Sequence, residues 1–598
     1  MDRRDGCSDE AGLVFFTVAG FSFFIREGAR IRANMGEGCI FRLQTNTTNM
    51  TRLRSLLLLL LFPFCTLHAQ KIDTAWLSAA GQLFDVAFTP AEKDSMVDGV
   101  TDNQRIYQKM HQQNLPNSQP YSLGFRPAPP GYAIPVKQLP VAWHLPVGTT
   151  LPANRNDLAF YTVAELASLV KTKKISSVEL TRFFLDRLKK WGDTLQCVVT
   201  LTEDLALQQA RQADEEIKKG IYKGPLHGIP YGLKDLFAVK GFKTTWGAAP
   251  YKDQVIDEDA FVYQQLKKAG AVLCAKLTLG ALASGDNWFG GKTKNPWNIN
   301  VGSSGSSAGP ASAVSAGLLP FAIGTETWGS IVSPSHTCGV TGLRPTFGSI
   351  SRSGAMVLSW SLDKAGPICR SAEDDAIVFY YLKGTDGKDG DAVNRAFNYT
   401  GKVNFKKLRI AYAGNYFKQI PKTMEQWAVI DVLKKAGADI KEVTFPDSTI
   451  YPFNIMRLII GAETAAAFDP MTRSDQDDLL TWQRKVDWPN GFRVSRIIPA
   501  AEYVNANRYR YSLMLALNDF MKQYDVIVLP TYAGNQLAMT NLTGHPVVCV
   551  PIGMNANGRP NSITFMGNLY DEATILAVAK AYQDASGFVK RHPEKFNN

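Results

Sequence analysis

Three short segments of this chain place a lysine and several serines in settings suited to chemistry. Lys234 ends an apolar run that begins at Ile229, and Val301–Gly309 is rich in glycine and serine. A third segment, Gly324–Ile331, contains Ser330. A serine hydroxyl is a weak nucleophile near neutral pH and needs a base within hydrogen-bond reach. A lysine serves as that base only when its amine is neutral. These residues therefore indicate a serine hydrolase whose base is an amine.

The surroundings of Lys234 favour a neutral amine. The preceding run Ile229–Leu233 is mostly apolar. Burial disfavours the ammonium ion and lowers the pKa by up to about 3–5 units when desolvation is complete. Lys276 also follows an apolar run, and we expect a structural role for it.

The elements that must position these segments alternate between strands and helices. Gly228–Leu233 and Ala271–Ala275 are predicted as buried strands, and Asp257–Ala269 as a helix between them. Thr162–Glu165 and Ser176–Glu179 are capping boxes that begin amphipathic helices. This alternation predicts an α/β fold with a buried, mixed sheet.

The segment from Gly224 to Thr346 resembles the amidase signature family, whose members hydrolyse carboxamides with a Ser–cis-Ser–Lys triad. Counting back without gaps from Gly324–Ser330 aligns Ser304–Gly309 with the Gly-Gly-Ser-Ser-Gly-Gly motif of that family. The cis-serine role therefore falls on Ser306 and not on the earlier Ser303. The resemblance extends over about residues 157–585.

The resemblance implies a mixed, twisted sheet covered by helices on both faces. It also implies a proton relay in which Lys234 deprotonates Ser306 and Ser306 deprotonates the nucleophile Ser330. The oxyanion would be bound by the backbone N–H groups of Thr327, Trp328, Gly329 and Ser330.

Three residues depart from the family pattern. Glu326 stands where many members have Asp, Trp328 where many have Gly, and Val332 where many have Arg. None of these changes removes a catalytic atom. Because Trp328 lies beside the expected oxyanion site, we expect it to narrow the acyl pocket and to contribute to substrate binding.

A competing assignment comes from Gly305–Gly309, which matches the G-x-S-x-G nucleophile elbow. It would make Ser307 the nucleophile and His545 its base. The elbow needs a strand directly before it, whereas Asn295–Asn300 is polar and typical of a turn. The lysine-based assignment is therefore preferred.

Composition excludes several classes of function. The net charge of +11 comes without a long Lys/Arg run, so no nucleic-acid partner is expected. No metal-ligand cluster and no phosphate-binding glycine loop is present, so neither a metal nor a cofactor is expected. The five cysteines after residue 69 are sparse and do not form a disulfide framework.

The N-terminus predicts export. Residues 50–69 have a basic start, a short apolar core from Leu56 and a small residue, Ala69, at the expected cut, as in a signal peptide. Residues 1–49 would then be a non-native upstream extension. Residues 70–155 form a helical and Pro-rich appendage, and 156–598 the catalytic domain. No membrane insertion is expected after signal removal.

The function predicted from these observations is an exported amidase, periplasmic or secreted, that acts on a small carboxamide or a peptide amide. Its specificity surface is expected to come from the weakly patterned residues 385–530. A homodimer is left open. The alternatives are the glutaminase component of a tRNA-dependent glutamine amidotransferase and a catalytically inactive binding protein on the same scaffold.

Overall fold

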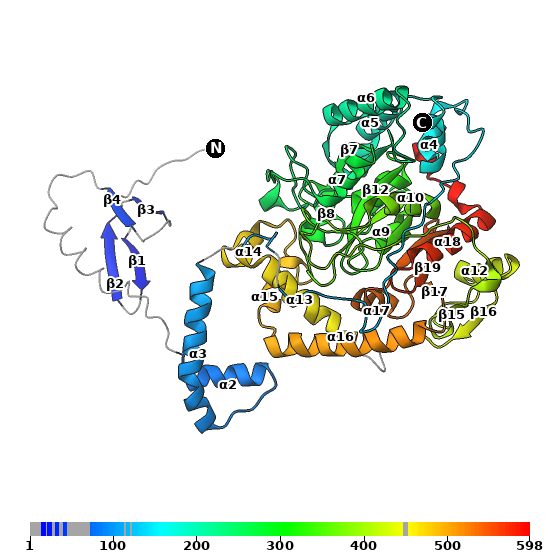
Figure 1. Ribbon diagram of the computed structural model, residues 1–598. Helices are drawn as coiled ribbons and strands as arrows, with labels where there is room; N and C mark the ends of the chain where they lie inside the picture. Colours follow the sequence, from blue (N-terminus) through cyan, green and yellow to red (C-terminus); the bar gives the residue numbers. More distant parts are fainter. Residues whose placement is uncertain are drawn as a thin grey trace, which may run out of the picture. The chain divides into compact units, whose positions relative to one another are not determined.

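The structure is a computed structural model (Figure 1). It describes the backbone of four short strands within the first 44 residues, and then residues 72–112, 115–119, 122–446 and 453–598. The predicted signal peptide, residues 50–69, lies outside the described residues. The chain divides into two compact units, Met1–Gln112 and Gln113–Asn598. The boundary differs from the one predicted at residue 155, because the Pro-rich segment belongs with the second unit.

The described residues of the first unit form two antiparallel strand pairs and two helices. The second helix begins with a capping box between Thr89 and Glu92, and Pro90 occupies its first turn, where a missing N–H costs nothing. Among all described residues, no helix has both the length and the apolar content needed to cross a bilayer. The elements of the first unit are β1 (Leu13–Val18), β2 (Phe21–Arg26), β3 (Arg30–Asn34), β4 (Ile40–Gln44), α2 (Thr74–Leu83) and α3 (Pro90–His111).

A mixed sheet forms the core of the second unit. Its strand order is β16-β15-β17-β19-β18-β13-β14-β12-β6-β7-β5. β6 pairs in parallel with β7 and β12, and β12 pairs antiparallel with β14. The strands of this sheet are β5 (Val198–Leu201), β6 (Pro230–Lys234), β7 (Val272–Leu277), β12 (Phe321–Glu326), β13 (Thr341–Arg344), β14 (Lys364–Cys369), β15 (Ile410–Ala413), β16 (Ile440–Val443), β17 (Val526–Pro530), β18 (Val547–Met554) and β19 (Pro560–Gly567).

Helices cover both faces of this sheet (Figure 1). On β14, Gly366 faces Ile331 at the start of α9, whereas Cys369 faces Asp375 of α10. Successive side chains of a strand point to opposite faces, so α9 and α10 lie on opposite sides. The predicted fold class is confirmed. The helices are α4 (Val163–Lys171), α5 (Ser177–Leu195), α6 (Glu203–Lys218), α7 (Phe261–Lys268), α8 (Ala308–Ser315), α9 (Val332–Cys338), α10 (Ala372–Leu382), α11 (Gly414–Phe417), α12 (Glu425–Lys435), α13 (Ile455–Ala467), α14 (Asp469–Arg473), α15 (Trp488–Ser495), α16 (Ala500–Met521), α17 (Gln536–Thr543) and α18 (Glu572–Ser586).

Local sequence signals locate these elements well. Both predicted capping boxes are present at the starts of α4 and α5. The helix predicted over 257–269 begins only at Phe261, after Ala260 in extended backbone. The segment judged turn-like before Ser303 contains a strand, β11 (Asn298–Gly302), so that prediction is wrong. β11 pairs with β10 (Lys294–Asn295) outside the central sheet, and β8 (Asn287–Trp288) pairs with β9 (Gly291–Lys292).

Residues 115–155, the N-terminal arm, have no α-helix or strand among their described residues and pack along the rest of the second unit. Tyr132 donates its hydroxyl to the carbonyl of Leu569 at 2.7 Å, and the carbonyl of Pro135 accepts the N–H of Ala396 at 2.7 Å. Prolines restrict φ and remove N–H donors, which accounts for the extended course.

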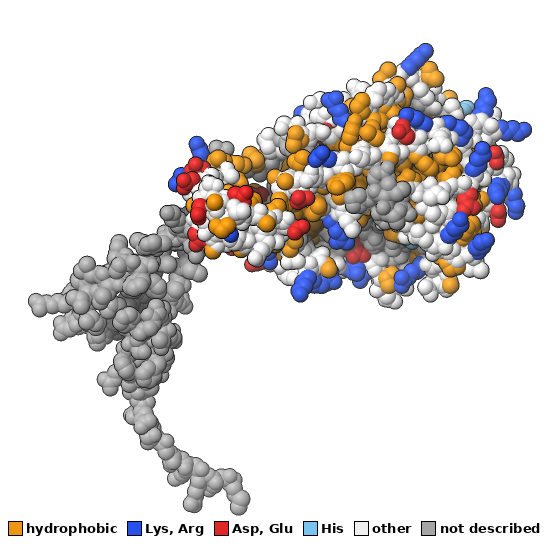
Figure 2. All heavy atoms as spheres, turned by 90° about the horizontal axis from the view of Figure 1, so that it is seen from below, with side chains coloured by type: hydrophobic (Ala, Val, Ile, Leu, Met, Phe, Trp, Pro, Cys, Tyr) orange, Lys and Arg blue, Asp and Glu red, His pale blue; other side chains and the backbone are white. Residues whose placement is uncertain are grey.

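Positive charge is dispersed on the face shown in Figure 2, which views the molecule from below. There, Lys and Arg side chains alternate with acidic and uncharged ones and form no continuous basic patch on the visible described surface.

Candidate active site

Strand β6 ends at Lys234, whose side chain is buried in the centre of the second unit. Its amine Nζ lies 2.8 Å from Ser306 Oγ, 3.1 Å from Ser307 Oγ and 2.8 Å from Thr325 Oγ1. These three neighbours are hydroxyl groups, a longer contact of 3.4 Å joins the amine to the carbonyl of Thr325, and no described carboxylate forms an ion pair with it. Lys234 and Ser306, predicted as base and relay, are therefore in direct contact.

Burial lowers the pKa of Lys234 to about 7, because removal from water disfavours the ammonium ion. Asp363 and Glu326 oppose this by favouring the charged form, but the loss of hydration is the larger effect. A large fraction of the amine is therefore neutral near pH 7. A neutral amine has a lone pair and can accept a proton from a hydroxyl group.

Lys276, on the neighbouring strand β7, has a different environment. Its Nζ forms a buried ion pair with Asp235 at 2.7 Å and donates to the carbonyl of Lys243 at 2.9 Å. The amine of Lys276 therefore donates to a carboxylate and a carbonyl, and no described contact places it against a serine hydroxyl. The contrast between these two buried lysines follows from the single carboxylate beside Lys276.

The loop between β11 and α8 carries Ser306, and the peptide bond Gly305–Ser306 is cis. Residue 305 must be glycine here, because a Cβ atom would lie 1.8 Å from the carbonyl oxygen of Gly285. The N–H of Ser304 donates to Asp286 Oδ2 at 3.0 Å and holds the start of the loop. Close backbone packing therefore defines the position of Ser306.

Ser330 lies in the turn between β12 and α9. Its carbonyl accepts the N–H of Ser307 at 3.1 Å, which brings the turn alongside the Ser306 loop. The hydroxyl of Ser307 forms two hydrogen bonds with the backbone of Thr325. It donates to the carbonyl at 3.0 Å and accepts the N–H at 3.1 Å. The segments that carry the three residues predicted as a triad, from β6, the α8 loop and the α9 turn, thus lie next to one another.

The backbone N–H groups of residues 327–330 have no protein acceptor within the described chain, whereas the next two N–H groups are both bonded. Gly329 has φ +89, so the turn uses a backbone conformation that favours glycine. Unpaired N–H groups in a largely buried turn form a site for a developing negative charge. These are the four residues predicted for the oxyanion hole.

Glu326 organises this turn, a role that sequence reasoning missed. Its carboxylate is buried and accepts the N–H groups of Ile331 and Val332, each at 2.9 Å. It also accepts Arg344 Nη1 and Asn541 Nδ2, each at 2.8 Å. Burial by itself raises the pKa of this carboxyl, but Arg344 and Lys364 outweigh burial and lower it to about 2. The charged carboxylate therefore fixes the start of α9 through its hydrogen bonds to the two N–H groups.

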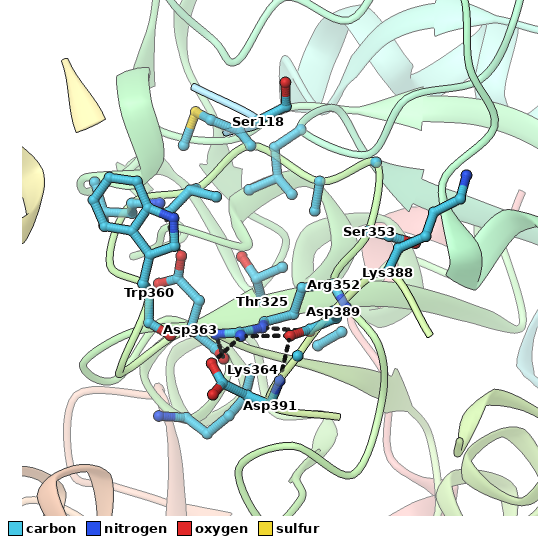
Figure 3. Close-up of a pocket in the computed structure, with 18 of the residues that line it drawn as sticks. Ser118, Thr325, Arg352, Ser353, Trp360, Asp363, Lys364, Lys388, Asp389 and Asp391 are labelled. Carbon is cyan, nitrogen blue, oxygen red and sulfur yellow. Dashed lines mark hydrogen bonds and ion pairs between the residues drawn. The ribbon is translucent and has the colours of Figure 1, made fainter. Parts of the chain in front are cut away.

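A cavity of about 540 Å³ borders the site (Figure 3). Thr325, which contacts Lys234, and Thr327, which donates to Asp363 at 2.5 Å, both line it. Among the described residues of the weakly patterned region 385–530, only residues 387–391 contribute to the lining. The other lining residues are Ser118, Ser122, Gly124, Arg126, Leu236, Phe237, Ala283, Arg352, Ser353, Gly354, Ala355, Met356, Val357, Leu358, Trp360, Asp363, Lys364 and Ala365.

Of the residues singled out from the sequence, Thr327 lines this cavity, whereas the lining does not include Lys234, Ser306, Ser330, Trp328 or His545. The side chain of Trp328 is 39% exposed and does not line it. His545 is buried, burial lowers its pKa to about 3, and its Nδ1 lies 2.9 Å from Thr543 Oγ1. No described contact joins His545 to Ser307, which leaves the competing elbow assignment without a base.

Among the described residues, no group of three or more His, Cys, Asp and Glu side chains could hold a metal ion. The cysteines 197, 274, 338, 369 and 549 are all free and buried.

The fold, the buried lysine and the serine-bearing turns agree with the family to which the chain is related. The family model described as Amidase matches residues 179–539. The chain belongs to this amidase family. Family membership supports an enzyme that hydrolyses or transfers at amide C–N bonds.

Individual relatives narrow the comparison. The chain is 34% identical over 483 residues to the glutamyl-tRNA(Gln) amidotransferase A-type subunit of Coxiella burnetii, covering 72% of this chain and 99% of the relative. The native peptide amidase of Stenotrophomonas maltophilia has a similar structure, with a TM-score of 0.64 and 28% identity over 72% of this chain and 98% of that one. An inhibitor-bound structure of a vestigial protein complex, described as revealing the evolutionary origins of an s-triazine catabolic enzyme, gives a TM-score of 0.66 at 25% identity, covering 71% of this chain and 98% of that one.

The prediction of export is wrong. The relatives include glutamyl-tRNA(Gln) amidotransferase subunits from Coxiella burnetii and Geobacillus stearothermophilus. Amidation of a charged tRNA takes place in the cytoplasm, so these relatives contradict an exported protein. The prediction rested on residues 50–69, outside the described part of the chain, and no other feature of the molecule supports a signal peptide, secretion or a periplasmic location.

Proposed function

We propose that this protein hydrolyses the C–N bond of a carboxamide through an acyl-enzyme on Ser330. The observation that carries the proposal is the contact between the buried amine of Lys234 and Ser306 Oγ, with no carboxylate partner for that amine in the described chain. Such an amine accepts a proton near pH 7. The free N–H groups of residues 327–330 would bind the oxyanion of the tetrahedral intermediate.

The proposed steps use only these residues. Neutral Lys234 takes the hydroxyl proton of Ser306, and Ser306 takes that of Ser330 as Ser330 attacks the carbonyl carbon. The relay then returns a proton to the departing amine, the C–N bond breaks, and the acyl group remains on Ser330. Water, activated by the same relay, releases the acid and restores Ser330.

A direct test is turnover by the purified chain alone. We expect it to release amine or ammonia from aliphatic, aromatic or peptide amides, in a one-to-one ratio with the carboxylic acid. A Ser330→Ala variant should release none above the uncatalysed rate. Equal release by the wild type and Ser330→Ala would refute the proposal.

The amidotransferase subunits among the relatives favour a second candidate, a glutaminase that delivers ammonia to an acceptor and works with partner proteins. It predicts a narrow preference for glutamine and a rate that depends on those partners. Hydrolysis of several amides by the isolated chain would favour the amidase. Activity with glutamine alone, and only after partner proteins are added, would favour the amidotransferase.

The pH dependence follows from the pKa of Lys234. The base must be neutral, so kcat/KM should rise with pH, with a midpoint at about 7. Below the midpoint, the rate should fall about tenfold for each pH unit, since the neutral fraction falls in that proportion. Steady-state rates from pH 5 to 9 measure this. A flat profile below pH 7 would exclude Lys234 as the base.

A further inference from the structure

The N-terminal arm supplies one wall of the cavity beside the candidate active site. Ser118, Ser122, Gly124 and Arg126 line this cavity together with Thr325. These four residues lie before residue 179, where the match to the family begins. The wall is therefore an addition of this chain to the matched segment.

Contacts on either side fix the arm against the cavity. The side-chain amide of Asn117 pairs with the backbone of Val357. It donates to the carbonyl at 2.9 Å and accepts the N–H at 2.8 Å, which is how a neighbouring strand would satisfy these two groups. The ring of Phe125 lies 3.4 Å from the guanidinium of Arg510, and the backbone N–H of Phe125 donates to Asp391. Gly124 passes so close to Asp391 that a Cβ would lie 2.5 Å from its carboxylate. The arm is thus a packed wall.

Every acidic side chain that lines the cavity already has protein partners. Asp389 and Asp391 both bind the guanidinium of Arg352, at 2.8 Å each (Figure 3). Asp363 accepts the hydroxyl of Thr327 and the N–H groups of Leu358 and Ser359. A cationic substrate would therefore find no free carboxylate here.

The basic side chains that line the cavity differ in this respect. Arg352 is neutralised by its two carboxylates, and Lys364 is buried, donates to the carbonyl of Leu362, and has a pKa held well below its usual value by burial. Arg126 and Lys388 are exposed, and neither has an ion-pair partner among the described residues. Two charges at the cavity are thus free, and both are positive.

From this imbalance we propose that the arm determines specificity, and that Arg126 binds an acidic group on the substrate. The preferred substrates are amides that carry a carboxylate on the part lying in the cavity. Lys388, on the loop 387–391, supports the same preference. This inference rests on the proposed amide hydrolysis for its substrate class.

The test measures binding, so that it does not depend on turnover. Calorimetry on Ser330→Ala protein compares the 4-nitroanilides of glutaric, hexanoic and 5-aminopentanoic acid, which have similar length but negative, neutral and positive ends. A second pair, acetylated 4-aminobenzoate and acetylated 4-toluidine, carries the acid on the amine side. We expect an acid-bearing compound to bind more tightly than its neutral partner in at least one set, and the cationic compound to bind most weakly.

Adding Arg126→Ala should weaken binding of the acid-bearing compound about fivefold, the upper range for an exposed ion pair, and leave the neutral compound within about twofold. Arg126→Lys should restore most of the loss, since it keeps the charge. Arg559→Ala, at an exposed arginine in the β18–β19 turn, is the matched control and should change nothing.

Equal effects of Arg126→Ala on acidic and neutral compounds, or none on either, would overturn the inference. The rate at which the wild type hydrolyses the same compounds is measured separately. If acidic compounds bind through Arg126 but no amide is hydrolysed, the proposed function fails while the assignment of the binding wall stands.

Discussion

Replacing Lys234 with methionine should lower kcat for amide hydrolysis by about 10²–10⁴-fold, the usual contribution of a positioned general base. Methionine fills a similar volume in the buried site but cannot accept a proton. Ser306 Oγ and Thr325 Oγ1 lose their amine partner, which costs about 1–3 kcal/mol in unfolding free energy. Steady-state kinetics and thermal unfolding of the same preparation measure both effects.

The matched control is Lys276→Met, because both lysines are fully buried and lie on neighbouring strands. This variant leaves the Asp235 carboxylate buried without its cation, so it should lose about 3–5 kcal/mol of stability. Its kcat per folded molecule should stay within a few-fold of the wild type. Reversal of the pattern, with Lys276→Met inactive and Lys234→Met active, would contradict the assignment of the base.

Glu326→Gln should lower the free energy of unfolding by about 3–5 kcal/mol, because Arg344 is then buried without a compensating charge. It should also reduce kcat, since the start of α9 that follows Ser330 loses its charged acceptor. Chemical denaturation and steady-state kinetics test the two effects.

The stability loss in Glu326→Gln has a defined pH dependence. The pKa of Glu326 is lowered in the folded protein, so its stabilising contribution is complete above the ordinary value of 4.5 and disappears as pH falls toward 2. The difference between wild type and variant should shrink over that range. The exposed Glu502→Gln is the control and should leave the melting temperature unchanged. A pH-independent difference would exclude the buried charge as the cause.

Local patterns in the sequence were sufficient to find the starts of α4 and α5 and the central strands β6 and β7, and the family resemblance paired Lys234 with Ser306. Capping boxes and apolar runs depend on neighbours within a few residues, as at Ser176–Glu179. The glycines and serines of the two turns are short motifs as well. A buried, mixed sheet could therefore be expected from these patterns, and its cover of helices on both faces followed from the family resemblance.

Long-range pairing could not be predicted in the same way. Glu326 and Arg344 are 18 residues apart, and Asn541, which shares the same carboxylate oxygen, lies 215 residues away from Glu326. The choice of partners depends on which strands become neighbours, and no local pattern specifies it. The contact of Thr325 with Lys234 was missed for the same reason.

The arm shows a further limit. Its prolines predicted an extended chain, but nothing in them indicated that Arg126 would reach the cavity. Trp328 illustrates the same limit: its closeness in sequence to Ser330 predicts a role in substrate binding, which stays a prediction, and its side chain is 39% exposed. The direction of a side chain in a turn depends on backbone angles that sequence alone does not specify.

The most direct test of the central claim is to identify the nucleophile on which the acyl-enzyme would form. A fluorophosphonate probe is added to the protein at about pH 7, and the labelled peptide is identified by mass spectrometry. The account predicts a single adduct on Ser330, and its rate should fall at least about a hundredfold in Lys234→Met, in keeping with loss of a general base. An adduct on Ser307, or labelling of Ser330 at an undiminished rate without the lysine, would contradict it.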